Sequence, residues 1–150
     1  MILGIGGSAM KRWIIFVVAA AMILLLMTIP FGEPYQLPFA QEEVETITIG
    51  NDFWRTYKVA ETEEEIALVV RKMNRIRVLG TYDAAESAEE GDYSRTIRFA
   101  LKDGREYAFE AMAVDGFGAT FTDATGTYLV YRFQPEALWN QLKAEEQILP

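Results

Sequence analysis

The 150-residue sequence contains no cysteine and no histidine. Without these side chains neither a Ser-His-Asp nor a Cys-His catalytic set can form, and the usual zinc sites are excluded. A disulfide is impossible too, so an exported domain of this sequence must be stabilised by packing alone. The motifs GxxxxGK[ST] and GxGxxG do not occur, which leaves nucleotide binding without support.

Carboxylates remain as candidate catalytic groups, because the sequence has 22 Asp and Glu residues against 14 Lys and Arg. Most of them fall in expected helix starts and loops, where solvation explains an acidic side chain. Asp115-Gly116 and Asp123-Ala124-Thr125-Gly126 lack the ligand spacing of an EF-hand loop and are typical of turns. We therefore expect no enzymatic activity, no cofactor and no metal ion.

One long apolar run stands near the N-terminus. Sixteen of the seventeen residues from Trp13 to Ile29 are apolar. Ten of these are Ile, Leu, Phe or Val, and at roughly 0.3–0.6 kcal/mol each they favour insertion into a bilayer by about 3–6 kcal/mol. A helix over the run spans about 26 Å, close to the roughly 30 Å of a hydrocarbon core. We predict that this segment binds the lipid bilayer as a single-pass anchor.

The charges beside the run set its expected orientation. Lys11 and Arg12 precede it, which favours a cytoplasmic N-terminus and an extracytoplasmic remainder. Trp13 and Phe31 are further expected anchor residues, and Phe31 is expected at the membrane interface. The expected segments are a cytoplasmic N-terminus at 1–12, a transmembrane anchor at 13–30, a stalk at 31–43 and an extracytoplasmic domain at 44–150.

A cleaved signal peptide is the alternative, since Met10 followed by Lys11-Arg12 resembles the start of one. The apolar run exceeds the usual signal-peptide core of about 7–15 residues, and no clear small-x-small site follows it. The best candidate, Pro38-Phe39-Ala40, has proline where a small residue belongs. We therefore favour a retained anchor in the cytoplasmic membrane over a secreted domain that starts near Gln41.

Proline followed by an aromatic residue recurs at every fourth position, in Pro30-Phe31, Pro34-Tyr35 and Pro38-Phe39. Proline cannot continue a helix and forces the preceding residue towards extended geometry. The pattern is typical of an interfacial aromatic belt followed by a semi-rigid stalk. A recognition motif for a partner is the alternative.

The stretch that follows is long enough for one domain. About 110 residues remain from Gln41, which suffices for one hydrophobic core but not for two. The part of the chain after the apolar run carries 12 basic and 22 acidic residues, hence a net charge of −10. This charge disfavours nucleic acid as a partner.

Local patterns predict the elements of this domain. Thr62-Glu63-Glu64-Glu65 is a capping box that starts a helix, and Pro135 opens a second one. Asp103-Gly104 supplies a tight hairpin turn. The order β-β-α-β-β-β-β-β-α predicts an α+β domain whose mostly antiparallel sheet is packed by one or two helices. The expected strands are Glu45–Gly50, Trp54–Val59, Ile76–Tyr82, Ile97–Leu101, Tyr107–Ala113, Ala119–Thr122 and Thr127–Phe133.

Alternation along these strands separates two faces of the sheet. The expected core face carries Ile97, Phe99, Leu101, Tyr107, Phe109, Leu129, Tyr131 and Phe133. The opposite face is our candidate binding surface for an envelope protein or peptide, because it mixes apolar with charged side chains. Its candidate residues are Arg98, Glu110, Met112, Tyr128, Val130 and Arg132. The alternative is an ordinary solvated face, or one covered by the second helix or the stalk.

The layout as a whole is a short basic N-terminus, an apolar anchor, then a small domain with TxxE before a helix and a DG hairpin. It resembles uncharacterised single-pass membrane-anchored proteins of bacteria with one small extracytoplasmic α+β domain, and no functional residue is carried over from that resemblance. We expect a membrane-tethered, non-catalytic binding or regulatory module. The alternative is a secreted ligand-binding or inhibitor domain released by cleavage.

Overall fold

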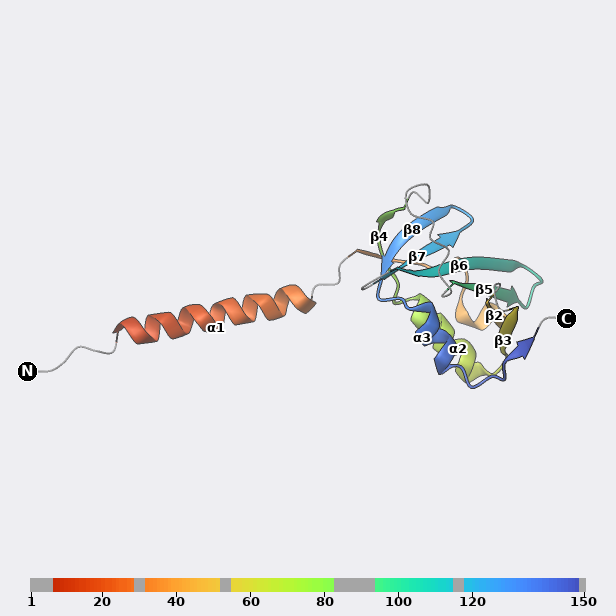
Figure 1. The fold of residues 1–150 in the computed structure, drawn as a ribbon, viewed down its shortest axis with the longest axis horizontal. Coiled ribbons are helices and arrows are strands. Elements are labelled where there is room, and N and C mark those ends of the chain that lie inside the picture. Colours follow the sequence, from red (N-terminus) through yellow and green to blue (C-terminus); the bar gives the residue numbers. More distant parts are fainter. Residues whose placement is uncertain (1–6, 29–31, 52–54, 83–93, 115–117, 149–150) are drawn as a thin grey trace, which may run out of the picture. The chain divides into compact units, whose positions relative to one another are not determined.

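The computed structural model of this chain describes residues 7–28, 32–51, 55–82, 94–114 and 118–148. The chain divides into two compact units, Met1–Phe31 and Gly32–Pro150 (Figure 1). The expected interfacial residue Phe31 and the expected turn at Asp115-Gly116 lie outside the described residues.

The first unit contains helix α1, Gly7–Thr28, which is 22 residues long. Between Ser8 and Thr28 the sequence has neither glycine nor proline, so nothing interrupts the helix. Its described side chains, at residues 12–24, are exposed, and Trp13 at 73 % is among the most exposed. Of the helices in the described residues, none combines the length and the apolar character needed to cross a bilayer.

The second unit is built on one sheet, which has nine strands among the described residues (Figure 1). Every pair of neighbouring strands is antiparallel. Their order across the sheet is β1-β4-β8-β7-β6-β5-β2-β3-β9. The strands are β1 Glu33–Pro34, β2 Val44–Asn51, β3 Thr56–Ala60, β4 Arg77–Thr81, β5 Ser94–Leu101, β6 Glu106–Val114, β7 Gly118–Asp123, β8 Gly126–Tyr131 and β9 Gln147–Ile148.

Helices α2, Glu63–Met73, and α3, Pro135–Gln141, lie together on one side of the sheet, and a single 3-10 turn η1, Gln41–Glu43, precedes β2 (Figure 1). The expected cap is present: the Thr62 hydroxyl accepts the N–H of Glu65 at 3.3 Å. Pro135 stands in the first turn of α3, where its missing N–H has no cost.

Two cations hold α3 against the strands. Lys58 Nζ lies 5.0 Å and Arg95 Cζ 4.8 Å from the centroid of the Trp139 ring. Lys58 also donates to the carbonyls of Trp139 and Leu142 at 3.3 and 3.1 Å, which satisfies acceptors left over at the helix end. The buried Arg95 forms an ion pair with Glu136 in the first turn.

The fold class expected from the sequence is confirmed, since the domain is α+β with a large antiparallel sheet and a few helices. From Val44 to Gln141 the elements also follow the expected order β-β-α-β-β-β-β-β-α. The short strands β1 and β9 lie outside that prediction. Each is two residues long and closes one edge of the sheet.

One hydrophobic core lies between the inner face of the sheet and the two helices. We call this covered side the inner face and the opposite side the outer face. The helices contribute Ile66, Val69, Val70, Met73, Leu138 and Trp139 to the core. The strands contribute Ile47, Ile49, Ile97, Phe99, Leu101, Phe109, Ala111, Ala119, Phe121 and Val130.

The segment expected to form a stalk, residues 31–43, differs from that expectation. Phe39 is buried, and its ring centroid lies 4.9 Å from that of Phe99. The ring of Tyr35 lies 4.9 Å from that of Phe121. Two of the three proline-aromatic repeats therefore supply side chains that pack on the inner face. Tyr35 and Phe39 therefore do not cover the outer face, as the alternative for the candidate binding surface supposed.

Strand β8 turns the opposite set of side chains towards the core from the set we expected. Val130 is fully buried and Tyr128 packs against the core, and both pair with core residues of β7. Leu129 and Tyr131, expected in the core, are half-buried on the outer face. The placement of Tyr128 and Val130 on the candidate binding surface is therefore wrong.

The cause lies at Arg132. Both alternating sets of side chains in β8 are largely apolar, so alternation alone does not select the set that enters the core. Arg132 has a φ of 64°, in the left-handed region that a non-glycine residue rarely adopts. The strand ends just before it, and Phe133 enters the core from the connection to α3. A period of two cannot be extended across such a residue.

The observed register makes a testable prediction. Val130→Ala should lower the free energy of unfolding by about 2–3 kcal/mol, because it removes two fully buried methyl groups. Leu129→Ala removes more carbon but should lower it by only about 1 kcal/mol or less, because that side chain is half-buried. Urea denaturation followed by tryptophan fluorescence measures both. A larger loss for Leu129→Ala would contradict the register.

Candidate partner-binding site

Three of the six residues expected on the candidate binding surface do share the outer face. Arg98 of β5 lies opposite Ala108 of β6, and Glu110 and Met112 follow along β6 with the same side-chain direction. Arg98 and Glu110 are exposed, and Met112 is half-buried. Tyr128 and Val130 face inward, and Arg132 is exposed beyond the end of β8.

Strands β7 and β8 complete this outer face with side chains that sequence reasoning did not place there. Thr122 and Thr127 are paired across the two strands, and their hydroxyls lie 3.0 Å apart. Leu129 and Tyr131 follow along β8. The outer face is therefore a mixture of threonine, aliphatic, aromatic and charged side chains that α2 and α3 do not bury.

A cavity of about 850 Å³ opens next to this face. Its volume is in the range of ordinary ligand sites, about 300–1,000 Å³. Three segments far apart in the sequence line it. They are the N-terminal segment at Tyr35, Gln36 and Pro38, the start of β6 from Glu106 to Glu110, and the β7–β8 turn from Thr122 to Thr125.

Tyr35 forms the fixed wall of the cavity. Its N–H donates to the carbonyl of Ile76 at 3.0 Å, and its hydroxyl donates to the Asp123 carboxylate at 2.8 Å. Its ring also meets Phe109 edge to face, with centroids 6.2 Å apart. Burial, and then the hydrogen bond to Asp123 and its charge, raise the pKa of Tyr35 well above its ordinary value. The hydroxyl is therefore a proton donor at any physiological pH.

Asp123 ties the β7–β8 turn to that wall. Burial alone raises the pKa of its carboxyl, but the bonds it accepts from the hydroxyl and N–H of Thr125, from Tyr35 and from the N–H of Gly126 outweigh burial and lower it. The N–H groups of Thr125 and Gly126 lie 2.7 and 3.2 Å from Oδ1. The carboxylate thus holds the turn and the N-terminal segment together.

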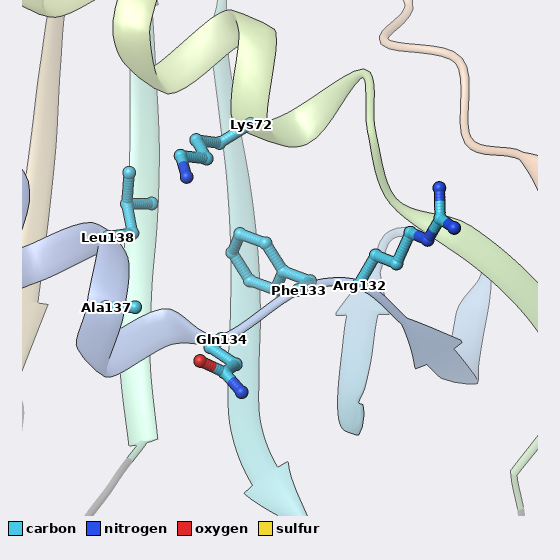
Figure 2. Close-up of a pocket in the computed structure, with 6 residues that line it drawn as sticks. All are labelled: Lys72, Arg132, Phe133, Gln134, Ala137 and Leu138. Carbon is cyan, nitrogen blue, oxygen red and sulfur yellow. The ribbon is translucent and has the colours of Figure 1, made fainter. Parts of the chain in front are cut away.

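A second, smaller cavity of about 160 Å³ lies between the end of α2 and the connection from β8 to α3. Its lining residues are Lys72, Arg132, Phe133, Gln134, Ala137 and Leu138 (Figure 2). The Lys72 side chain extends towards Leu138, whereas the Arg132 guanidinium points away from it (Figure 2). Lys72 stands in the last turn of α2, where a cation offsets the helix dipole. The charged groups of Lys72 and Arg132 therefore do not converge on one anion-binding site.

The carboxylates of the larger cavity do not have the geometry of a hydrolytic pair. Glu106 and Glu110 lie four residues apart on one strand, about 13 Å along it, whereas glycosidase pairs need about 5–9.5 Å. Asp123 projects from the inner side of the sheet, because it continues the alternation of Phe121. Among the described residues, no group of three or more carboxylate, histidine or cysteine side chains could hold a metal ion.

Comparison with known proteins adds no relative. No protein-family model, no curated protein and no solved structure matches this chain. The resemblance in layout to membrane-anchored bacterial proteins stays a prediction.

Sequence reasoning missed the cavity because its two key residues had another interpretation. Tyr35 belongs to the proline-aromatic repeat, which predicted a stalk, and Asp123 belongs to a turn. The turn prediction is confirmed, because Ala124 and Thr125 connect β7 to β8. The proline-aromatic repeat could have indicated the site. Besides a stalk or a recognition motif, regularly spaced aromatic side chains are also compatible with packing against a core.

Asp123 generates a prediction about pH. Because its pKa is lowered in the folded state, the ionised carboxylate stabilises the fold above its ordinary pKa of 3.8 and this contribution is lost as the pH falls through the lowered value. Asp123→Asn should therefore cost about 1–2 kcal/mol at pH 7, and the difference from the unmodified chain should shrink below about pH 4. Thermal melting between pH 2.5 and 7 measures this, with Glu145→Gln as a charge control. A difference that is constant over this range would contradict it.

Proposed function

We propose that this chain is a non-catalytic protein-binding module, tethered to the cytoplasmic membrane with its domain on the outer side. The observation that carries the binding role is the cavity beside the outer face, whose walls are fixed by Tyr35 and Asp123. Because the walls of this cavity are already fixed, little conformational entropy of the protein is lost when a partner binds there. The carboxylate spacing and the lack of histidine and cysteine support binding rather than catalysis.

The tether is supported by the surface of α1. Between residues 12 and 24 the described side chains are exposed, and they include Trp13, Ile15 and Phe16 at 66–73 %. A contiguous apolar surface of this kind favours a lipid or protein environment over water. Lys11 and Arg12 at one end favour the orientation in which the domain is exported.

The position of Gly32 shortens the tether. The compact domain begins there, so residues 29–31 are all that separates it in sequence from the end of α1. Three or four residues span at most about 14 Å. A domain anchored by α1 therefore works beside the bilayer, and its partner is an envelope protein or peptide within that reach.

A secreted domain released by cleavage is the second candidate, and one observation bears on it. The best cleavage site, at Pro38-Phe39-Ala40, lies within the folded domain, where Phe39 is 9 % exposed. Cleavage there would remove Phe39 from the core and Tyr35 from the cavity wall. This supports the retained anchor.

The tether is tested with two arginines. Ala20→Arg with Leu24→Arg should move the protein from the carbonate-washed membrane pellet to the soluble fraction, because each central arginine opposes insertion by about 2.5–3.5 kcal/mol. Glu145→Arg with Glu146→Arg places two arginines at exposed positions of the domain and should leave the protein in the pellet. Intact mass should give an uncleaved chain. A mature form that begins near Gln41 would sink the anchor.

The binding role is tested by crosslinking in native membranes. A photoreactive residue in place of Arg98 should give a discrete protein adduct, because this position lies on the outer face beside the cavity. The same residue in place of Glu63, exposed in the first turn of α2, should not. Identical adducts from both positions, or none from Arg98, would refute binding through this face.

A further inference from the structure

The sheet has a gap in its hydrogen-bonding ladder beside the cavity. Strand β5 pairs with β6 from Glu106 to Met112, but β7 pairs with β6 only from Glu110 to Val114. Strand β7 stops pairing with β6 after Thr122, because the turn to β8 begins at Asp123. Over residues 106–109, β6 therefore has a strand on one side, and on the other side no strand among the described residues pairs with it, which leaves an open edge.

The direction of the free backbone groups follows from the β5–β6 hairpin, which immediately precedes Glu106. Leu101 donates its N–H to the carbonyl of Arg105 at 2.9 Å, so these residues point their backbone groups at each other. Backbone groups alternate sides along an antiparallel strand, so those of Tyr107 and Phe109 also point to β5. Those of Glu106 and Ala108 point to the open side. Both residues are exposed there.

We propose that this open edge binds an extended, basic segment of a partner protein as an added strand, with the N–H and C=O of Ala108 at its centre. The inference rests on the proposed protein-binding function and names the class of partner. An exposed strand edge is a template for another extended chain. The methyl side chain of Ala108 leaves its backbone open to such a chain.

The acidic side chains around the open edge favour a basic partner strand. Of the described residues that line the cavity, Glu106, Glu110 and Asp123 are acidic and none is a lysine or arginine. Arg98, across from Ala108 on β5, offsets one of these charges, and the site stays negative. A second copy of this chain would bring the two glutamates against their own counterparts, which costs free energy. Lysine or arginine side chains of a partner strand instead meet carboxylates.

The added strand has a defined length and side-chain pattern. The open edge runs from Glu106 to Phe109, about 10 Å, and ends against the turn at Ala124. Three or four residues of the partner can pair there. Alternate side chains of the added strand then face the two glutamates on the outer face, and the others face Tyr35 and Pro38 in the cavity.

The test uses the full chain in neutral detergent micelles and an end-blocked, fluorescein-labelled peptide of alternating lysine and valine. Anisotropy should give an affinity about ten-fold higher than for the same peptide with glutamate in place of lysine. Methylating every backbone nitrogen of the lysine peptide keeps the charge but removes all of the strand's N–H groups, and should also weaken binding about ten-fold. Exchange of the Ala108 N–H with solvent should slow when the lysine peptide is bound.

Matched variants separate the site from the overall charge. Glu106→Gln with Glu110→Gln should weaken peptide binding about ten-fold, whereas Glu145→Gln with Glu146→Gln makes the same change in net charge and should alter it less than about two-fold. Equal effects of the two pairs, or equal binding of the methylated peptide, would overturn the proposal. If the peptide fails but the Arg98 crosslink persists, strand addition is wrong while the protein-binding function stands. If peptide binding and the Arg98 crosslink are both absent, strand addition and the protein-binding function are both refuted.

Discussion

A chain of aromatic contacts across the inner face is the interaction on which the rest of the domain depends. Consecutive ring centroids lie 4.9–6.2 Å apart, and each such pair contributes about 0.5–1.5 kcal/mol beyond the burial of its surface. The contacts link Phe39, Phe99, Phe109, Phe121 and Phe133 in this order, and the ring of Tyr35 lies against Phe109 and Phe121. These contacts join strands β5, β6 and β7 and the connection from β8 to α3 to the N-terminal segment, in a protein that has no cysteine for a disulfide. The cavity exists because this packing fixes Tyr35 on one side of it and β6 on the other.

Sequence patterns predicted the elements wherever one face of a strand was clearly polar. On β5 the alternation of Ile97 and Phe99 with Arg98 favours one register, because a slip by one residue would turn Ile97 and Phe99 to the outer face and Arg98 into the core. On β8 both alternating sets are apolar, so nothing local distinguishes them. Because the backbone at Arg132 is left-handed, Phe133 points into the core although Tyr131, two residues earlier, lies on the outer face. Such a conformation is set by the connection to α3, which periodicity does not describe.

The candidate site was out of reach of local patterns for a related reason. Its walls come from three segments, and the hydrogen bond between Tyr35 and Asp123 joins residues 88 positions apart. The proline-aromatic repeat has a sufficient explanation beside a membrane, so it gave no reason to look for a partner in the core. Arg98, Glu110 and Met112 were predictable together, because they depend only on strand alternation and the hairpin at Asp103-Gly104.

The edges of this sheet are treated in two different ways. At its two ends the last strands, β1 and β9, are only two residues long, which limits how much backbone another chain could pair with. Inside the described part of the sheet, β6 keeps an open edge beside the β7–β8 turn, and Glu106 and Glu110 stand at its two ends. Acidic side chains there protect the edge from copies of the same acidic chain, since like charges would meet. They do not protect it from a basic strand, so the feature that prevents self-association is also the one that gives the open edge a preferred partner.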